Sequence, residues 1–151
     1  MFSHKFNGPA WRYEIGFSIF GGDIVWANGP FRAGESEINI FKMEGGLREN
    51  MLPSEAIECD GGYQGDWKLK NPSTAATRTE RGQKSGIRAR HEIVNGRLKQ
   101  FSCLDQVFRH LSSEQHGYCF MAVVVITQMT FDLHDHLYDV NYDVVYHDMS
   151  V

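Results

Sequence analysis

Two acidic residues stand where a carboxylate could hold a metal ion, and Asp60 is the first of them. It follows the stretch 55–59 (EAIEC) and precedes Gly61 and Gly62. The two glycines keep bulky side chains away from the carboxylate, so a hydrated hard cation can approach it. An aspartate that only forms a turn before glycine has the same pattern. The residue types alone leave both interpretations of Asp60 open.

The second acid is Glu92, which lies among basic and amide side chains at helical spacing. Arg88 comes four residues before it, and Asn95 and Lys99 come three and seven residues after it. On a helix, these four side chains share one face. A carboxylate among groups that bind phosphate is explained if the acid holds a metal and the bases hold a nucleic-acid backbone. The alternative is an ordinary ion pair between Glu92 and Arg88.

Charge is distributed unevenly along the sequence. The whole chain of 151 residues has a formal net charge of −4. Residues 66–100 contain nine Lys or Arg against three Asp or Glu, a net charge of +6, so the remaining residues carry −10. Such a stripe indicates a local site for a polyanion in an otherwise acidic protein. A solvated loop and helix face would have the same composition.

The first half of the chain has the composition of strands and short helices. Residues 12–19 and 22–27 are rich in aromatic and β-branched residues and are joined through glycines, which predicts an antiparallel hairpin. Apolar residues recur at near-helical spacing in 35–49, which predicts a short helix interrupted by glycines. Residues 55–59 are expected to form the buried strand that leads into Asp60.

The second half is expected to be largely helical. Residues 64–86 are polar and are predicted to form a loop. Residues 86–101 are predicted to form an amphipathic helix, whose packed face carries Ile87, Val94, Leu98 and Phe101. The stretch 118–131 is apolar nearly all round, which predicts a fully buried helix. Residues 137–146 have the composition of a closing strand, although an ordered arm is also compatible with it.

Composition sets the broad class of protein. With 42% hydrophobic residues, 151 residues are enough for one domain with a real core. Cys59, Cys103 and Cys119 are widely spaced and odd in number, which predicts buried thiols in a reducing compartment. No apolar segment is long enough to cross a bilayer, so we expect no membrane association.

The order of these motifs resembles the DDE superfamily endonucleases of Harbinger-like transposable elements. The resemblance covers residues 2–131 and runs through FSHKFNGPAWRYEIG, IVWANGPF, ECDGGYQG, RARHEIVNGRLKQF and CFMAVVVITQ. Its specific parts are the Asp-Gly-Gly-Tyr that follows a strand and the Arg-x-Arg-x-Glu-x-x-Asn-x-x-x-Lys-x-Phe helix. Matched to the family, Asp60 and Glu92 are the second and third catalytic acids and metal ligands. A DNA-contact role is implied for four basic residues of the helix: Arg88, Arg90, Arg97 and Lys99.

The resemblance also implies a fold and a chemistry. The fold class is mixed α/β, of the RNase H-like kind, in which three carboxylates from separate elements meet. Mg²⁺, or Mn²⁺ in its place, would be the cofactor, because oxygen-only ligands suit a hard cation. The family's first catalytic Asp precedes the segment that corresponds to residues 2–6, so the sequence is expected to lack the first strand and that acid. Residues 1–131 are accordingly expected to form a partial transposase domain, and residues 132–151 a C-terminal tail.

The function implied is that of a transposase-derived, metal-dependent DNA endonuclease that is inactive by itself. One alternative is an active nuclease whose first Asp comes from a separate exon or a partner chain. The other is a domesticated DNA-binding or interaction module with no enzymatic activity. DNA is the expected partner, and nuclear localisation follows from that function alone. A homo-oligomer and a separate DNA-binding partner protein are both compatible with the resemblance.

Overall fold

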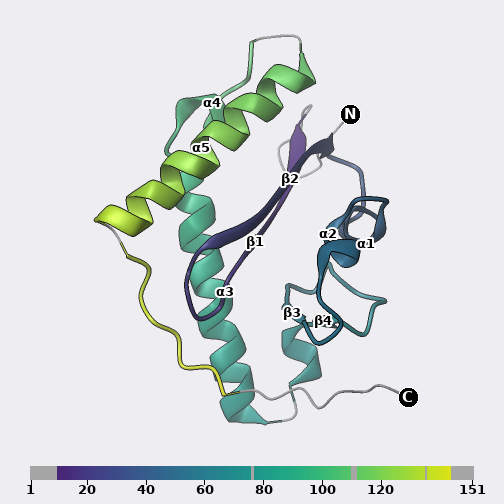
Figure 1. Ribbon diagram of the computed structural model, residues 1–151. Helices are drawn as coiled ribbons and strands as arrows, with labels where there is room; N and C mark the ends of the chain where they lie inside the picture. The colour runs from purple at the N-terminus through teal and green to yellow at the C-terminus, as the bar shows by residue number, and fades with distance from the viewer. Residues whose placement is uncertain (1–9, 76, 110–111, 135, 144–151) are drawn as a thin grey trace. The chain divides into compact units, whose positions relative to one another are not determined.

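A computed structural model describes residues 10–75, 77–109, 112–134 and 136–143 (Figure 1). They form a mixed α/β structure, as expected, with two two-stranded sheets. Two compact units make up the chain: among the described residues, unit 1 comprises 10–35 and 90–138, and unit 2 comprises 36–89 and 139–143. Helix α3 (Arg78–Leu98) contributes residues to both. The tail boundary expected after Phe131 falls within the last turn of another helix, α5 (Ser113–Leu133).

Unit 1 begins with a hairpin of β1 (Trp11–Phe17) and β2 (Ile24–Arg32), which confirms the predicted one. The strands are antiparallel, with Ile15 opposite Ala27. Gly22 lies in the turn with φ of 78°, a conformation that glycine adopts without steric cost. The turn is closed by two backbone hydrogen bonds, one of which runs from the Ser18 N–H to the Asp23 carbonyl at 2.8 Å.

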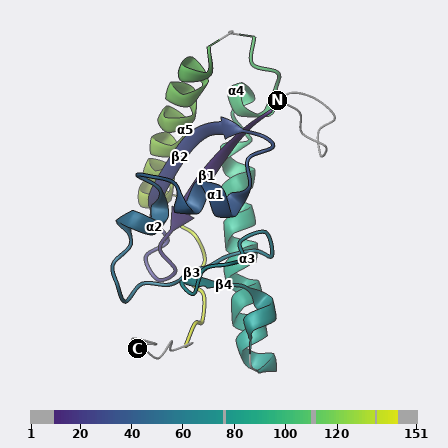
Figure 2. The same cartoon turned by 90° about the vertical axis from the view of Figure 1, so that its right-hand side faces the viewer.

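The core of unit 1 lies where the hairpin, the C-terminal half of α3 and α5 meet. Figures 1 and 2 both show α5 alongside the hairpin. A short helix, α4 (Ser102–Asp105), packs partly buried side chains against the same core. The buried members of this core are Val94, Leu98, Phe120, Val123, Val124, Phe131 and Leu137. Leu137 shows that the chain beyond α5 belongs to this core as well.

Helix α5 is longer than predicted and only half buried. The hydroxyl oxygen of Ser112 caps it by accepting a hydrogen bond from the Gln115 N–H at 3.3 Å. One face packs into the core of unit 1 through Phe120, Val124 and Phe131, and the Phe120 ring stacks on Tyr13 of β1. The opposite face is exposed and equally apolar. The expectation of burial all round was therefore wrong within unit 1, because a two-stranded hairpin can cover only one side of a helix.

Unit 2 contains α1 (Glu37–Lys42), α2 (Leu47–Asn50) and a short parallel pair of strands. The two helices take the place of the predicted interrupted one, and Gly45 and Gly46 separate them as expected. Strand β3 (Ile57–Glu58) pairs with β4 (Leu69–Lys70), with Ile57 opposite Leu69. The strand predicted over 55–59 is thus confirmed but shorter.

The predicted loop 64–86 is more structured than expected. It contains β4, a 3₁₀ turn labelled η1 (Pro72–Thr74) and the first turns of α3, which begins eight residues before the predicted Gly86. The Thr77 hydroxyl oxygen accepts a hydrogen bond from the Glu80 N–H at 3.1 Å. Thr77 and Glu80 have the spacing of a capping box, which is the sequence signal for this helix start that the predicted start at Gly86 did not take into account.

Residues 136–143 follow α5 as an arm without helix or strand. Tyr142, near the end of the arm, is 9% exposed and belongs to unit 2. Of the two alternatives for the tail, the described part matches the ordered arm, and residues 144–146 lie outside the described residues. Among the helices in the described ranges, none is long and apolar enough to cross a membrane.

Candidate metal and nucleic-acid site

Asp60 lies in an exposed turn two residues after β3 in unit 2. Its Oδ1 accepts a hydrogen bond from the Gly62 N–H at 2.8 Å, and its carbonyl accepts one from the Tyr63 N–H at 3.3 Å. The turn-forming role that the sequence allowed is therefore present. It leaves lone pairs on both carboxylate oxygens, since a carboxylate has about four acceptor sites. The turn and a metal-ligand role are compatible.

A second carboxylate, that of Glu37, lies beside Asp60. A Cβ placed on Gly62 would come 2.0 Å from Glu37 Oε2 and 3.1 Å from Asp60 Oδ1, so the two oxygens are within about 5 Å of each other. A larger residue at position 62 would require the Glu37 side chain to move. Sequence reasoning missed Glu37, because its approach to Asp60 depends on how α1 packs within unit 2 and not on local spacing. The Asp60 turn therefore offers two carboxylates rather than one.

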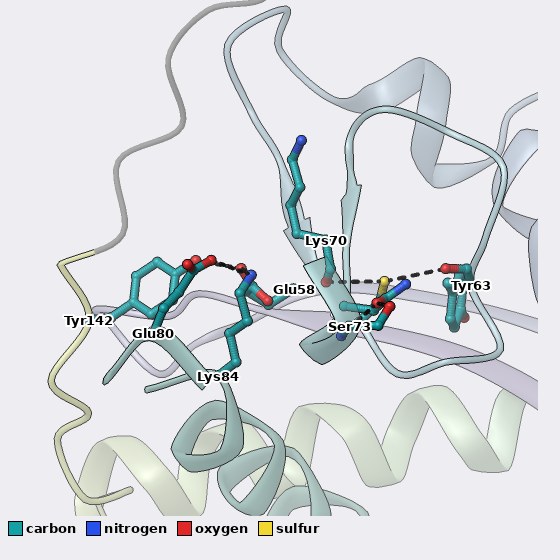
Figure 3. Close-up of polar contacts among 9 residues, drawn as sticks. Glu58, Tyr63, Lys70, Ser73, Glu80, Lys84 and Tyr142 are labelled. Atoms are coloured by element: carbon teal, nitrogen blue, oxygen red, sulfur yellow. Dashed lines mark hydrogen bonds and ion pairs between the residues drawn. The ribbon is translucent and has the colours of Figure 1, made fainter. Parts of the chain in front are cut away.

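A buried ionic cluster fixes the strand that leads into this turn (Figure 3). Lys84 of α3, whose side chain is 1% exposed, places Nζ 2.6 Å from Oε1 of Glu58 and 3.6 Å from Oε1 of Glu80. The Tyr142 hydroxyl donates to the same oxygen of Glu58. Burial and this hydrogen bond raise the pKa of Tyr142 above its usual range, so the hydroxyl keeps its proton. The cluster was missed, although Lys84 precedes buried Ile87 by one helical turn and so shares its face.

Cys59 lies between the cluster and the Asp60 turn, and its chemistry follows from its neighbours. Burial, with the charges of Asp60 and Glu58, raises the pKa of its thiol to about 12. Its Sγ lies 3.4 Å from the Lys70 carbonyl, to which the thiol donates. A protonated thiol is a poor nucleophile. Cys59 is thus a structural residue, and all three cysteines are free thiols that are partly rather than fully buried.

Glu92 lies on the exposed face of α3, in the half that belongs to unit 1. Arg88 is exposed with it, whereas Ile87, Val94 and Leu98 are no more than 5% exposed. Lys99 is exposed as well, but it follows the helix, which ends three residues before the predicted Phe101. The predicted facing of this helix is therefore confirmed. In the described part of the chain, no ion pair joins Glu92 to Arg88, so the alternative explanation of this acid is not realised.

Arg90 does not share the exposed face. It is 2% exposed, and its guanidinium donates from Nη1 to the Ile19 carbonyl at 2.6 Å. A Cβ on Gly22 would come 2.3 Å from Arg90 Nη2, so the glycine in the hairpin turn also makes room for the guanidinium. The side chain supports the hairpin and has no surface to offer DNA here. Its position three residues after Ile87 and four before Val94 was the signal of burial.

The other helix residues divide between packing and exposure. Arg97 is half-buried, with Cζ 4.9 Å from the centre of the Phe131 ring. His91 stacks on Phe17 with the ring centres 5.2 Å apart, so this side chain packs against the hairpin. Asn95 is also half-buried, and its Nδ2 lies 3.2 Å from His91 Nδ1. Of the four predicted DNA contacts, Arg88 and Lys99 are the exposed ones.

The candidate ligands lie in different units: Asp60 in unit 2 and Glu92 in unit 1. Their convergence on one metal site stays a prediction. Across the described ranges, no three His, Cys, Asp or Glu side chains are grouped so that they could hold a metal ion. Comparison of the chain with protein-family models, with curated proteins and with solved structures finds no match.

Proposed function

We propose that this chain is a transposase-derived domain of the DDE kind that binds DNA through α3 and a divalent metal through Asp60 and Glu92. The observation that carries the proposal is the exposed face of α3, where Glu92 lies between Arg88 and Lys99, the residue that follows the helix, and where the described residues show no ion pair between Glu92 and Arg88. An exposed carboxylate between two basic side chains could hold a metal ion while the basic side chains bind the DNA phosphates.

The residues fit Mg²⁺ or Mn²⁺ in chemical type. Asp60 and Glu92 are exposed carboxylates, and Glu37 adds a third oxygen donor group close to Asp60. A divalent metal bound there would neutralise charge on a phosphodiester and lower the pKa of bound water. The family's first Asp has no counterpart in the motifs matched here, so we propose that these residues do not cleave DNA by themselves. The RNase H-like fold and a nuclear location belong to the same proposal.

Metal and DNA binding can be measured separately on the purified protein. Mn²⁺ binding is followed by electron paramagnetic resonance, and DNA binding by fluorescence anisotropy over a range of salt concentrations. D60N and E92Q are expected to weaken Mn²⁺ binding at least tenfold, because each removes one charged ligand. E49Q changes an exposed glutamate in α2 and serves as the control. Unchanged Mn²⁺ binding in D60N and E92Q would contradict the metal site.

The DNA side of the proposal rests on Arg88 and Lys99. R88A and K99A are expected to weaken DNA binding and to lower the salt slope by about one each, as the loss of a phosphate contact does. R32A, which removes an exposed arginine of β2, is the matched control. DNA binding that needs no metal and survives D60N and E92Q would favour the non-enzymatic module, for which the hydrogen-bonded turn at Asp60 is the supporting observation.

A further inference from the structure

The exposed face of α5 carries a continuous apolar stripe. Tyr118, Met121, Val125, Ile126, Met129 and Leu133 are 43–66% exposed, and Ala122 lies exposed among them. Their spacing places them on one side of the helix, along about 22 Å of its length. A monomer rarely exposes a contiguous apolar patch larger than a few hundred Å², and larger patches mark interaction sites.

The charges on α5 limit the kind of partner that can bind the apolar stripe. Helix α5 contains no Lys or Arg, and its two acids, Glu114 and Asp132, lie near its ends. Nucleic acid and an anionic lipid surface both require basic residues beside the apolar ones. An uncharged centre with polar ends is the composition of a protein–protein interface. The stripe therefore suits another apolar helix.

The stripe is complementary to itself when two copies run antiparallel. About a two-fold axis between Val125 and Ile126, these two residues face each other across the interface, and Tyr118 faces Leu133. Ala122 then faces Met129, so a small side chain meets a long one at each of the two flanking positions. A two-fold interface requires self-complementarity of this kind, and antiparallel helix dipoles attract each other.

The exposed apolar area of the stripe is sufficient for a dimer of modest affinity. Six large side chains that are about half exposed offer on the order of 100 Å² each, or roughly 600 Å² per copy. Two copies would bury about 1,200 Å², at the lower end of the range for specific interfaces. We propose that this chain forms a homodimer through an antiparallel contact between the α5 helices of two copies, a property independent of DNA and metal binding.

Sedimentation equilibrium of the full chain over a range of concentrations tests the proposal. The wild-type protein is expected to approach twice the chain mass of 17.3 kDa at high concentration. V125E places a charge at the centre of the contact and is expected to weaken dimerisation roughly 30-fold or more, as loss of a central contact does. V107E changes an exposed valine outside α5 and should leave the dimer unchanged. Circular dichroism confirms that each variant is folded.

The antiparallel orientation has its own test. Y118K and L133E each place a charge at one end of the stripe, so each alone is expected to weaken the dimer. An equimolar mixture is expected to recover it, because the introduced ammonium of one copy faces the introduced carboxylate of the other. A wild-type chain that stays monomeric, a V125E dimer of undiminished strength, or a mixture no stronger than its components would overturn the proposal. I126E provides a second central variant if V125E does not fold.

Discussion

His116 is buried inside unit 1 and held among aromatic side chains. The Tyr13 hydroxyl lies 2.5 Å from its Nδ1, and the Phe108 ring meets it edge-on at 4.7 Å. Burial lowers the pKa of His116 below its usual value of 6.5 and outweighs the opposite effect of its backbone hydrogen bond. The imidazole is therefore neutral in the folded protein at pH 7, and protonation there would place a charge among apolar groups.

This burial makes the stability of the chain depend on pH in a defined direction. A base whose pKa is lowered on folding binds its proton more readily in the unfolded chain, so the free energy of unfolding falls as pH drops below about 6.5. The fall ends at the folded-state pKa. Urea unfolding at several pH values between 8 and 5 measures how the free energy of unfolding depends on pH. H116Q should remove this part of the slope, whereas H134Q, at an exposed histidine, should retain it. Equal slopes in H116Q and H134Q would contradict the assignment.

At the scale of residues, the sequence predicted which side of α3 is exposed but misplaced Arg90. Val94 and Leu98 were assigned to the packed face from spacing alone, and they are buried. Arg90 was grouped with the DNA contacts because of its charge, although its spacing from Ile87 and Val94 placed it on the packed face. Helical periodicity was the better guide, because a guanidinium can be buried where a carbonyl such as that of Ile19 accepts its hydrogen bond.

Helices and strands that depend on local sequence patterns were predicted well. The hairpin followed from β-branched and aromatic residues on either side of glycines, and α1 and α2 from helical spacing broken by Gly45 and Gly46. The strand pair β3–β4 was predicted only in its first half, because two paired residues on each strand carry too little pattern to be recognised. The cluster of Glu58, Lys84 and Tyr142 joins residues far apart in the chain. Helical spacing could indicate that Lys84 is buried, but not which residues it meets.

The Lys84 cluster is expected to be the main electrostatic support of β3. K84M would leave the Glu58 and Glu80 carboxylates close together without their cation, and the expected loss is about 3–5 kcal/mol of unfolding free energy. The double variant K84M/E58L removes both the Lys84 ammonium and the Glu58 carboxylate, so it should lose less unfolding free energy than K84M. Urea unfolding followed by circular dichroism measures both. R81M, at an exposed position of the same helix, should change stability by less than about 0.5 kcal/mol.

At the scale of the whole molecule, the sequence indicated one domain, and the structure groups the chain into two units. Both units combine segments from distant parts of the sequence, and α3 contributes to each. No composition shift or linker marks such a division, because the boundaries fall between Glu35 and Ser36, within α3 and after Tyr138. The division follows from tertiary contacts alone.

The C-terminal arm is expected to support one unit and not the other. Truncation after Tyr138 removes Tyr142, whose hydroxyl binds Glu58 within unit 2. Local stability follows the contacts of each cooperative unit, so hydrogen exchange should become faster in β3 and in residues 78–89. The amides of β1, β2 and α5 should keep their protection, because their core lies in unit 1. Y142F should produce a smaller change in the same segments, since it removes only the hydrogen bond. Hydrogen exchange followed by mass spectrometry resolves these peptides, and an equal acceleration in both units would show that they open together.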